Sequence, residues 1–218
     1  VLVCHGYTSK AKHMAGFVNK FYSLGYNVLA ADARAHGDSE GTKIGMGWPE
    51  RFDVIEWIKL IISWDSNAQI ILHGVSMGAA TVLMASGEEL PENVKAIIAD
   101  CGYTSEWDEF KCEANALHIP WFPVLNAASV MSKLRDGYDF KQASALEKVK
   151  QSRIPTLFIH GSDDELVPYS MLDKLYSAAA CEKECLTVNG AGHALSSSVE
   201  PELYWNTVEN FIEKYLEK

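Results

Sequence analysis

The stretch "QIILHGVSMGAATVLMAS", residues 69–86, joins an apolar run to a helix-forming run through a cluster of small residues. Its first five residues are typical of a buried strand, and its last eight are typical of a helix. Between them Ser76 stands two residues after one glycine and two before another, which matches G-x-S-x-G. At a strand-to-helix turn this pattern is the nucleophile elbow, which holds a strained serine at the top of a sheet. The stretch therefore predicts an α/β fold with a nucleophilic serine at one edge of its sheet.

Short apolar runs of the same kind recur along the chain and predict the other strands. Most of them do not alternate between apolar and polar residues, which indicates burial on both faces and therefore a parallel sheet covered by helices. At 218 residues the chain fits one domain. We expect a doubly wound, mostly parallel sheet flanked by helices over residues 1–218. The predicted strands are residues 1–4, 27–31, 69–73, 94–100, 156–160 and 185–188.

Three segments have the apolar spacing of helices that pack on a sheet, namely residues 11–24, 50–64 and 200–217. In the second segment, the stripe expected to face the core is Phe52, Ile55, Ile58 and Ile62. The third segment is expected to close one face of the sheet through Tyr204, Val208, Phe211, Ile212 and Tyr215.

The predicted base follows the last strand. A serine hydroxyl is a weak nucleophile until a base takes its proton, so the elbow needs a histidine. His193 lies in the small-residue loop "NGAGHALSS", and ligands in doubly wound folds bind beyond the carboxyl ends of the strands. Of the seven histidines it is the predicted base, and the four beside a glycine or strand are expected to make structural hydrogen bonds.

The base needs a carboxylate to accept its other ring N–H and to stabilise the imidazolium. The stretch "HGSDDELVP", residues 160–168, offers Asp163, Asp164 and Glu165 in the loop after a strand. Asp100, at the end of an earlier strand, would reach the same edge of the sheet. Spacing alone leaves the choice among these carboxylates open.

An oxyanion hole requires two backbone N–H donors aimed at the developing charge. One is expected from Met77, directly after the nucleophile, and the other from Tyr7 in the turn "HGYTS" after the first strand. Their side chains matter little for this task.

Residues 103–150 separate two predicted strands by more than a crossover needs and contain the proline-punctuated "HIPWFPVL". We expect a short helical, cap-like insertion over the active edge; a plain pair of packing helices with a kink is the alternative. The insertion is expected to supply an apolar or aromatic substrate pocket, although such side chains also serve as core. The predicted pocket residues are Trp107, Trp121, Phe122, Leu125 and Met131.

Composition excludes several classes of protein. The net charge of −10 and the absence of a dense basic cluster argue against a nucleic-acid partner, and no apolar stretch is long enough to span a membrane. Five cysteines without CxxC spacing suggest neither a metal site nor a disulfide framework, and Cys181 and Cys185 are expected to be unpaired. No cofactor is expected, and a reducing compartment such as the cytoplasm is favoured.

With these residues in view, the chain resembles the α/β-hydrolases, in their esterase, lipase and serine-aminopeptidase-like branch. The loop pattern DxRGHGxSxG is matched from Asp32 to Gly41, except that Ala35 replaces the glycine before the histidine. The early HG, the G-x-S-x-G, a GxxDxxVP at 161–168 and the GH ending at His193 follow in the family's order over nearly the whole chain. The resemblance assigns the triad acid to Asp164.

Members of this superfamily normally begin with an antiparallel hairpin and a further strand before the HG turn, and this chain starts at that last strand. We expect that a native segment of some tens of residues precedes Val1; in some relatives such a segment includes a membrane anchor.

The predicted reaction is acyl transfer to water through a Ser76–His193–Asp164 triad, on a carboxylic ester of a small apolar or aromatic molecule. A serine peptidase, amidase or thioesterase using the same triad is the alternative, because the fold does not choose among them. No glutamate pair that would hold a substrate amine can be identified. A non-catalytic binding protein is a further alternative.

Overall fold

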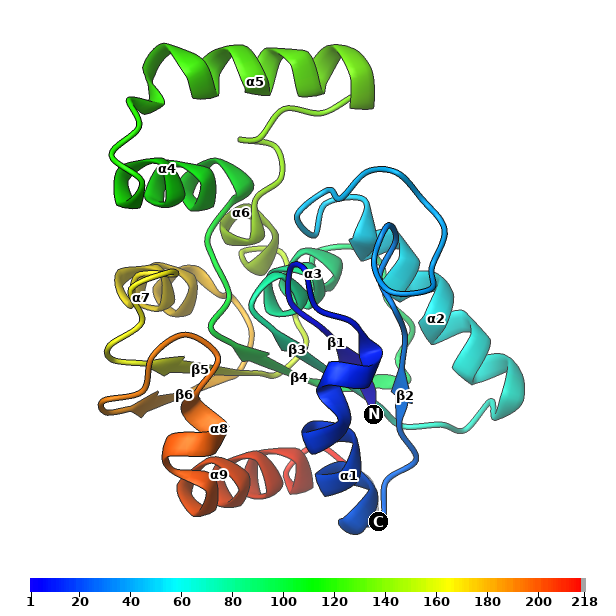
Figure 1. Ribbon diagram of the computed structural model, residues 1–218. Coiled ribbons are helices and arrows are strands. Elements are labelled where there is room, and N and C mark those ends of the chain that lie inside the picture. The colour runs from blue at the N-terminus through cyan, green and yellow to red at the C-terminus, as the bar shows by residue number, and fades with distance from the viewer. Residues whose placement is uncertain (217–218) are drawn as a thin grey trace.

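The computed structural model describes residues 1–216, and a six-stranded sheet lies at its centre (Figure 1). The strand order is β2-β1-β3-β4-β5-β6, and every neighbouring pair is parallel. The sheet confirms the doubly wound architecture, and each predicted strand overlaps an observed one. The strands are β1 (Leu2–Cys4), β2 (Leu29–Ala30), β3 (Ile70–Val75), β4 (Val94–Asp100), β5 (Thr156–Gly161) and β6 (Lys183–Val188).

Burial explains the apolar runs. Every residue of β3 and β5 is buried, because both faces of the central strands are covered by helices. On one face lie α1 (Ala15–Ser23) and α9 (Pro201–Glu213), and on the other lie four further helices (Figure 1). These are α2 (Glu50–Trp64), α3 (Met77–Ser86), α6 (Ala145–Val149) and α7 (Ser170–Ala178). Two short helices, η1 (Ala11–Met14) and α8 (Ser196–Val199), complete the body.

The helix α9 closes one face of the sheet as predicted, with Tyr204, Val208, Phe211 and Ile212 buried; residue 217 lies outside the described residues. The predicted stripe of α2 is partly wrong. Ile58 is buried but Phe52 is 50% exposed, and the buried face is Glu50, Arg51, Val54 and Ile58. Hydrogen bonds explain why this face of α2 is buried. The Glu50 carboxylate accepts the N–H groups of Gly45 and Gly47 at 2.7 and 2.9 Å, which holds the Glu50 side of the helix against the body.

The segment between β4 and β5 is helical. It forms α4 (Glu106–Ala116) and α5 (Trp121–Asp136) before α6, and an antiparallel bridge between Ser105 and Ser144 joins its two ends. In Figure 1, α4 and α5 stand beyond the helices that cover the sheet, with α5 outermost. Within residues 1–216, no helix is both long and apolar enough to cross a bilayer.

Candidate active site

Ser76 lies at the turn between β3 and α3. Its backbone has φ 56° and ψ −119°, a conformation that non-glycine residues rarely adopt. Its N–H donates to the carbonyl of Asp100 at the end of the neighbouring strand β4, at 2.9 Å. The strand, the sharp turn and the helix therefore hold the serine above the sheet, as the G-x-S-x-G pattern predicts.

The two glycines of the pattern are required by close backbone contacts. A Cβ on Gly74 would lie 2.3 Å from the carbonyl oxygen of Gly78, and a Cβ on Gly78 would lie 2.2 Å from that of Cys4. Both neighbours are backbone atoms of packed elements, so neither clash is relieved by moving a side chain. The glycines set how closely α3 approaches β1 and β3.

We therefore expect Gly78→Ala to lower the free energy of unfolding by about 3 kcal/mol or more, because overpacking a rigid contact displaces backbone. Gly16→Ala is the matched control: a Cβ there meets nothing within 4 Å, and alanine favours the helix by about 0.5 to 1 kcal/mol. Denaturant unfolding of both variants tests this, and equal stabilities would contradict the packing argument.

His193 lies between the serine and a carboxylate. Its Nε2 is 2.8 Å from Ser76 Oγ, and its Nδ1 is 2.8 Å from Asp164 Oδ2. The imidazole is partly exposed, whereas the Asp164 carboxylate is fully buried. Side chains from three distant loops thus form one chain of hydrogen bonds at the carboxyl ends of the strands. Such a chain allows the imidazole to take a proton from the serine while the carboxylate holds its orientation.

Asp164 is held as an anion by its surroundings. Its Oδ1 accepts the N–H groups of Leu166 and Val167 at 3.0 and 2.9 Å, and His160 Nε2 lies 3.2 Å from its Oδ2. Burial alone would raise the pKa of Asp164, but the hydrogen bonds from His160 and His193 outweigh it and hold that pKa well below its usual range.

The other carboxylates have different surroundings. Asp163 and Glu165 are exposed. Asp100 is completely buried, and it is its backbone carbonyl that contacts the elbow. Burial raises the pKa of Asp100 to about 7. The structure therefore brings Asp164, and none of these three, against the imidazole.

Two other histidines shape the turn beside the serine. His5 Nε2 accepts the N–H of Ala33 at 2.9 Å, and His36 Nε2 accepts the N–H of Thr8 at 3.2 Å. These bonds tie the "HGYTS" turn to the loop after β2. The same loop holds Ala35 at φ 58°, a left-handed conformation that explains why glycine suits this position.

The predicted oxyanion donors lie next to Ser76. Met77 is the first residue of α3, and the first N–H groups of a helix have no acceptor within it. Tyr7 follows Gly6, where a Cβ would lie only 3.2 Å from Ser76 Cβ, so the turn packs directly against the serine. Both residues line the cavity beside Ser76.

That cavity has a volume of about 640 Å³, within the range of small-molecule sites. Ser76 and His193 line it, together with apolar side chains from η1, α1, the 44–46 loop and α4. Helix α4 also contributes two carboxyl groups, those of Glu109 and Glu113. Sequence reasoning missed this pair, because spaced glutamates on a predicted helix are typical of a solvated face.

Comparisons with known proteins identify the family of this chain. Residues 1–142 match the model of the family described as serine aminopeptidase, S33. The chain belongs to this S33 family of α/β-hydrolases. It is a hydrolase of the α/β type.

Two relatives of this S33-family chain are informative. The Bacillus subtilis protein YqkD, described as uncharacterized, is 30% identical over 98% of this chain and 70% of its own length. The lysophosphatidylserine lipase ABHD12 of Macaca fascicularis is 31% identical over 83% of this chain, which spans 45% of that lipase. Among solved structures, the Pyrococcus furiosus esterase Pf2001 has a TM-score of 0.80 at 24% identity, covering 99% of this chain and 82% of the esterase. At that identity the likeness supports the fold.

The five apolar and aromatic residues predicted for the substrate pocket lie elsewhere in this S33-family chain. None of the five is among the residues that line the cavity. Trp107 and Trp121 stack edge to face, Leu125 is buried, and Phe122 and Met131 are 66% and 52% exposed. Four of the five belong to α5, and α4 lies nearer the body than α5 (Figure 1). Trp107 is on α4, but the residues of that helix that line the cavity are Glu109, Phe110 and Glu113.

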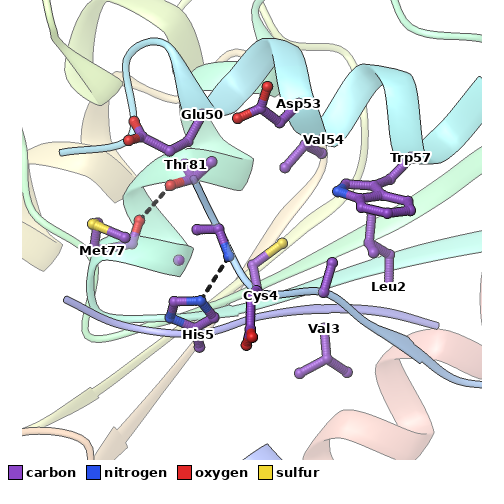
Figure 2. Close-up of a pocket in the computed structure, with 14 residues that line it drawn as sticks. Leu2, Val3, Cys4, His5, Glu50, Asp53, Val54, Trp57, Met77 and Thr81 are labelled. Carbon is purple, nitrogen blue, oxygen red and sulfur yellow. Dashed lines mark hydrogen bonds between the residues drawn. The ribbon is translucent and has the colours of Figure 1, made fainter. Parts of the chain in front are cut away.

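A second pocket lies behind the elbow (Figure 2). It has a volume of about 30 Å³, enough for a water molecule but far too small for an ester. Figure 2 shows Glu50, Asp53, Val54 and Trp57 along α2 on one side and His5 on the other. This space is a packing gap between β1, α2 and α3, separate from the cavity at Ser76.

One cluster of potential metal ligands coincides with the triad. The donor atoms of Cys101, Asp164 and His193 lie within 4.8 Å of one another, the only such group among residues 1–216. Burial, together with nearby carboxylates, raises the pKa of the Cys101 thiol well above its ordinary value. A metal ion there would need the thiolate and would compete with the His193–Asp164 bond, so the donor set does not fit a resident metal. All five cysteines are free, including Cys181 and Cys185.

Helix α4 carries a buried carboxyl whose effect on stability depends on pH. Burial, together with the charges of Glu50 and Asp136, raises the pKa of Glu106 from 4.5 to about 8. Between these two pH values the native state holds a proton that the unfolded state has lost. The stability contributed by this group is therefore present below pH 4.5 and is lost as the pH rises through 8.

We expect Glu106→Gln, which does not titrate, to gain about 3 kcal/mol in free energy of unfolding relative to the wild type between pH 5.5 and pH 8.5. Guanidinium unfolding at both pH values measures this difference. The exposed Glu92→Gln is the control. A Glu106→Gln difference that is the same at both pH values would contradict the assignment.

Proposed function

We propose that this protein is a serine hydrolase that cleaves carboxylic esters, with Ser76 as nucleophile, His193 as base and Asp164 as triad acid. The observation that supports it most is the position of the His193 imidazole, 2.8 Å from both Ser76 Oγ and Asp164 Oδ2. A binding protein would have no use for a strained serine, a matched imidazole and a buried carboxylate held as an anion.

In the proposed reaction, Ser76 Oγ attacks the ester carbonyl carbon while His193 Nε2 takes the hydroxyl proton. The carbonyl oxygen gains negative charge and is stabilised by the backbone N–H groups of Tyr7 and Met77, each such donor contributing roughly 100- to 1,000-fold in rate. His193 then gives the proton to the departing alkoxide, and an acyl-serine and a free alcohol form. Water, deprotonated by the same imidazole, attacks the acyl-serine. The bond between the acyl carbon and Ser76 Oγ then breaks, His193 returns the proton to Oγ, and the acid is released.

The substrate class follows from the lining of the cavity. Phe17, Ile44, Met46, Phe110 and Leu166 give it an apolar wall next to the nucleophile, which suits the hydrocarbon of an acyl chain. A lipase among the relatives, which acts on a lysophospholipid by its name, is consistent with such a substrate. A small-molecule ester with an apolar acyl group therefore fits best.

A serine peptidase is the second candidate, and one observation favours it. Glu109 and Glu113 place carboxyl groups in the cavity, and carboxylates bind amines. The family is also described by an aminopeptidase activity.

Paired substrates separate the two candidates. p-Nitrophenyl butyrate tests ester cleavage, and aminoacyl p-nitroanilides test removal of an N-terminal residue. The ester proposal expects hydrolysis of the butyrate at a kcat/KM at least roughly 100-fold above that for any of the anilides. The reverse order of activities would replace the esterase proposal with the peptidase.

A further inference from the structure

Glu109 is a polar side chain that the proposed mechanism does not use. It lies on α4, is 5% exposed and lines the cavity that contains Ser76. Its Oε2 is buried and has no hydrogen-bond partner among the described residues. A buried polar atom without a partner costs free energy, so such atoms are rare and call for an explanation. A ligand in the adjoining cavity would supply the missing partner.

The charges of the residues that line the cavity limit which chemical groups could bind Glu109. No lysine or arginine is among the described residues that line it, and Glu113 adds a second carboxyl group one helical turn from Glu109. A negatively charged substrate group would be repelled there. The partner of Glu109 must therefore be a hydrogen-bond donor without negative charge.

The protonation state of Glu109 favours a neutral partner. Burial, together with the charges of Glu113 and Asp164, raises the pKa of Glu109 to about 8. A protonated carboxyl both donates and accepts a hydrogen bond, as a hydroxyl does, so the two groups satisfy each other completely. An ammonium group would instead require a buried ion pair, whose desolvation is costly.

We propose that Glu109 is a specificity residue that binds a hydroxyl on the alcohol portion of the ester substrate. The apolar wall of the cavity suits the acyl chain. The hydroxyl that Glu109 binds therefore belongs to the alcohol portion of the ester. The substrate class is then a monoester of a polyol. This inference rests on the proposed function.

The same helix provides a matched control. Glu106 is 3% exposed, its Oε2 is also buried without a partner among the described residues, and its pKa is also raised to about 8. It is not among the residues that line the cavity. Replacing either glutamate with methionine removes one unpartnered carboxyl and puts an apolar side chain of similar length in its place. Both variants are therefore expected to fold. Melting temperatures check this.

The test compares glycerol monobutyrate with propyl butyrate, which share the acyl group and the length of the alcohol but differ by two hydroxyls. We expect the wild type to prefer the glycerol ester in kcat/KM by roughly tenfold, the effect of about one well-formed hydrogen bond. Glu109→Met should abolish this preference while it still hydrolyses propyl butyrate. Glu109→Gln, which keeps a donor and an acceptor, should retain most of it, and Glu106→Met should retain all of it.

Three results would overturn this proposal and leave the proposed function in place. The wild type could fail to prefer the glycerol ester, or Glu109→Met could keep the preference of the wild type. Butyrylcholine could be preferred over both esters in a way that depends on Glu109, which would make the site one for a cation. Failure of the wild type to hydrolyse any of these esters would refute the proposed function and, with it, this subsite.

Discussion

Ser76→Ala should lose ester hydrolysis by a factor on the order of 10⁵ to 10⁶ in kcat, while it keeps the melting temperature of the wild type. The factor is large because Oγ is the atom that attacks the carbonyl, and without it His193 has no hydroxyl to activate. Residual activity would come from the oxyanion donors acting on water. Hydrolysis of p-nitrophenyl butyrate measures the loss.

Ser63→Ala is the matched control, since that serine is on α2 and its hydroxyl donates only to the Leu60 carbonyl. It should keep the activity of the wild type. Activity of Ser76→Ala within tenfold of the wild type would show that another group is the nucleophile.

Asp164→Asn should lose about 10⁴-fold in kcat, because an amide in place of the carboxylate no longer fixes the tautomer of His193 or stabilises the imidazolium. The neighbouring carboxylate provides a control with the same change of charge. Asp163 is exposed and accepts a hydrogen bond from the Ser162 hydroxyl.

Asp163→Asn should remain within about twofold of the wild type in the same assay. A large loss in Asp163→Asn with little loss in Asp164→Asn would reverse the assignment of the triad acid.

The parts of the fold that depend on local pattern could be predicted from the sequence. The strand, glycines and helix around Ser76 lie within eighteen residues. The steric requirement for Gly74 comes from Gly78 in the same motif, whereas that for Gly78 comes from Cys4 on β1. Continuous apolar runs indicated strands buried on both faces, and β3 and β5 are buried at every residue. Both patterns can be read from the sequence without knowing which distant residues are in contact.

Which carboxylate contacts His193 could not be decided by spacing. Asp163, Asp164 and Glu165 are adjacent, and what distinguishes Asp164 is tertiary: its side chain turns inward to two backbone N–H groups and two imidazoles. The family pattern GxxDxxVP was the only sequence signal that pointed to it. That pattern reflects the turn, because the two N–H donors belong to Leu166 and Val167 within the same motif.

The lining of the cavity was predicted least well. Aromatic residues of the insertion suggested a pocket, yet α5 turns Leu125, Ser129 and Ser132 inward and leaves Phe122 and Met131 outside. Glu109, which has the helical spacing of a surface charge, is instead buried in the cavity wall. The way a helix of mixed composition faces its neighbours depends on the layers around it, which periodicity alone does not supply.

The central claim, that Ser76, His193 and Asp164 form a working proton relay, is tested most directly by a fluorophosphonate, which reacts with an activated serine. Native protein should acquire one adduct, and peptide mass mapping should place it on Ser76. His193→Ala and heat-denatured wild type should acquire almost none. A native protein that gains no adduct, or gains it on another serine, would contradict the account.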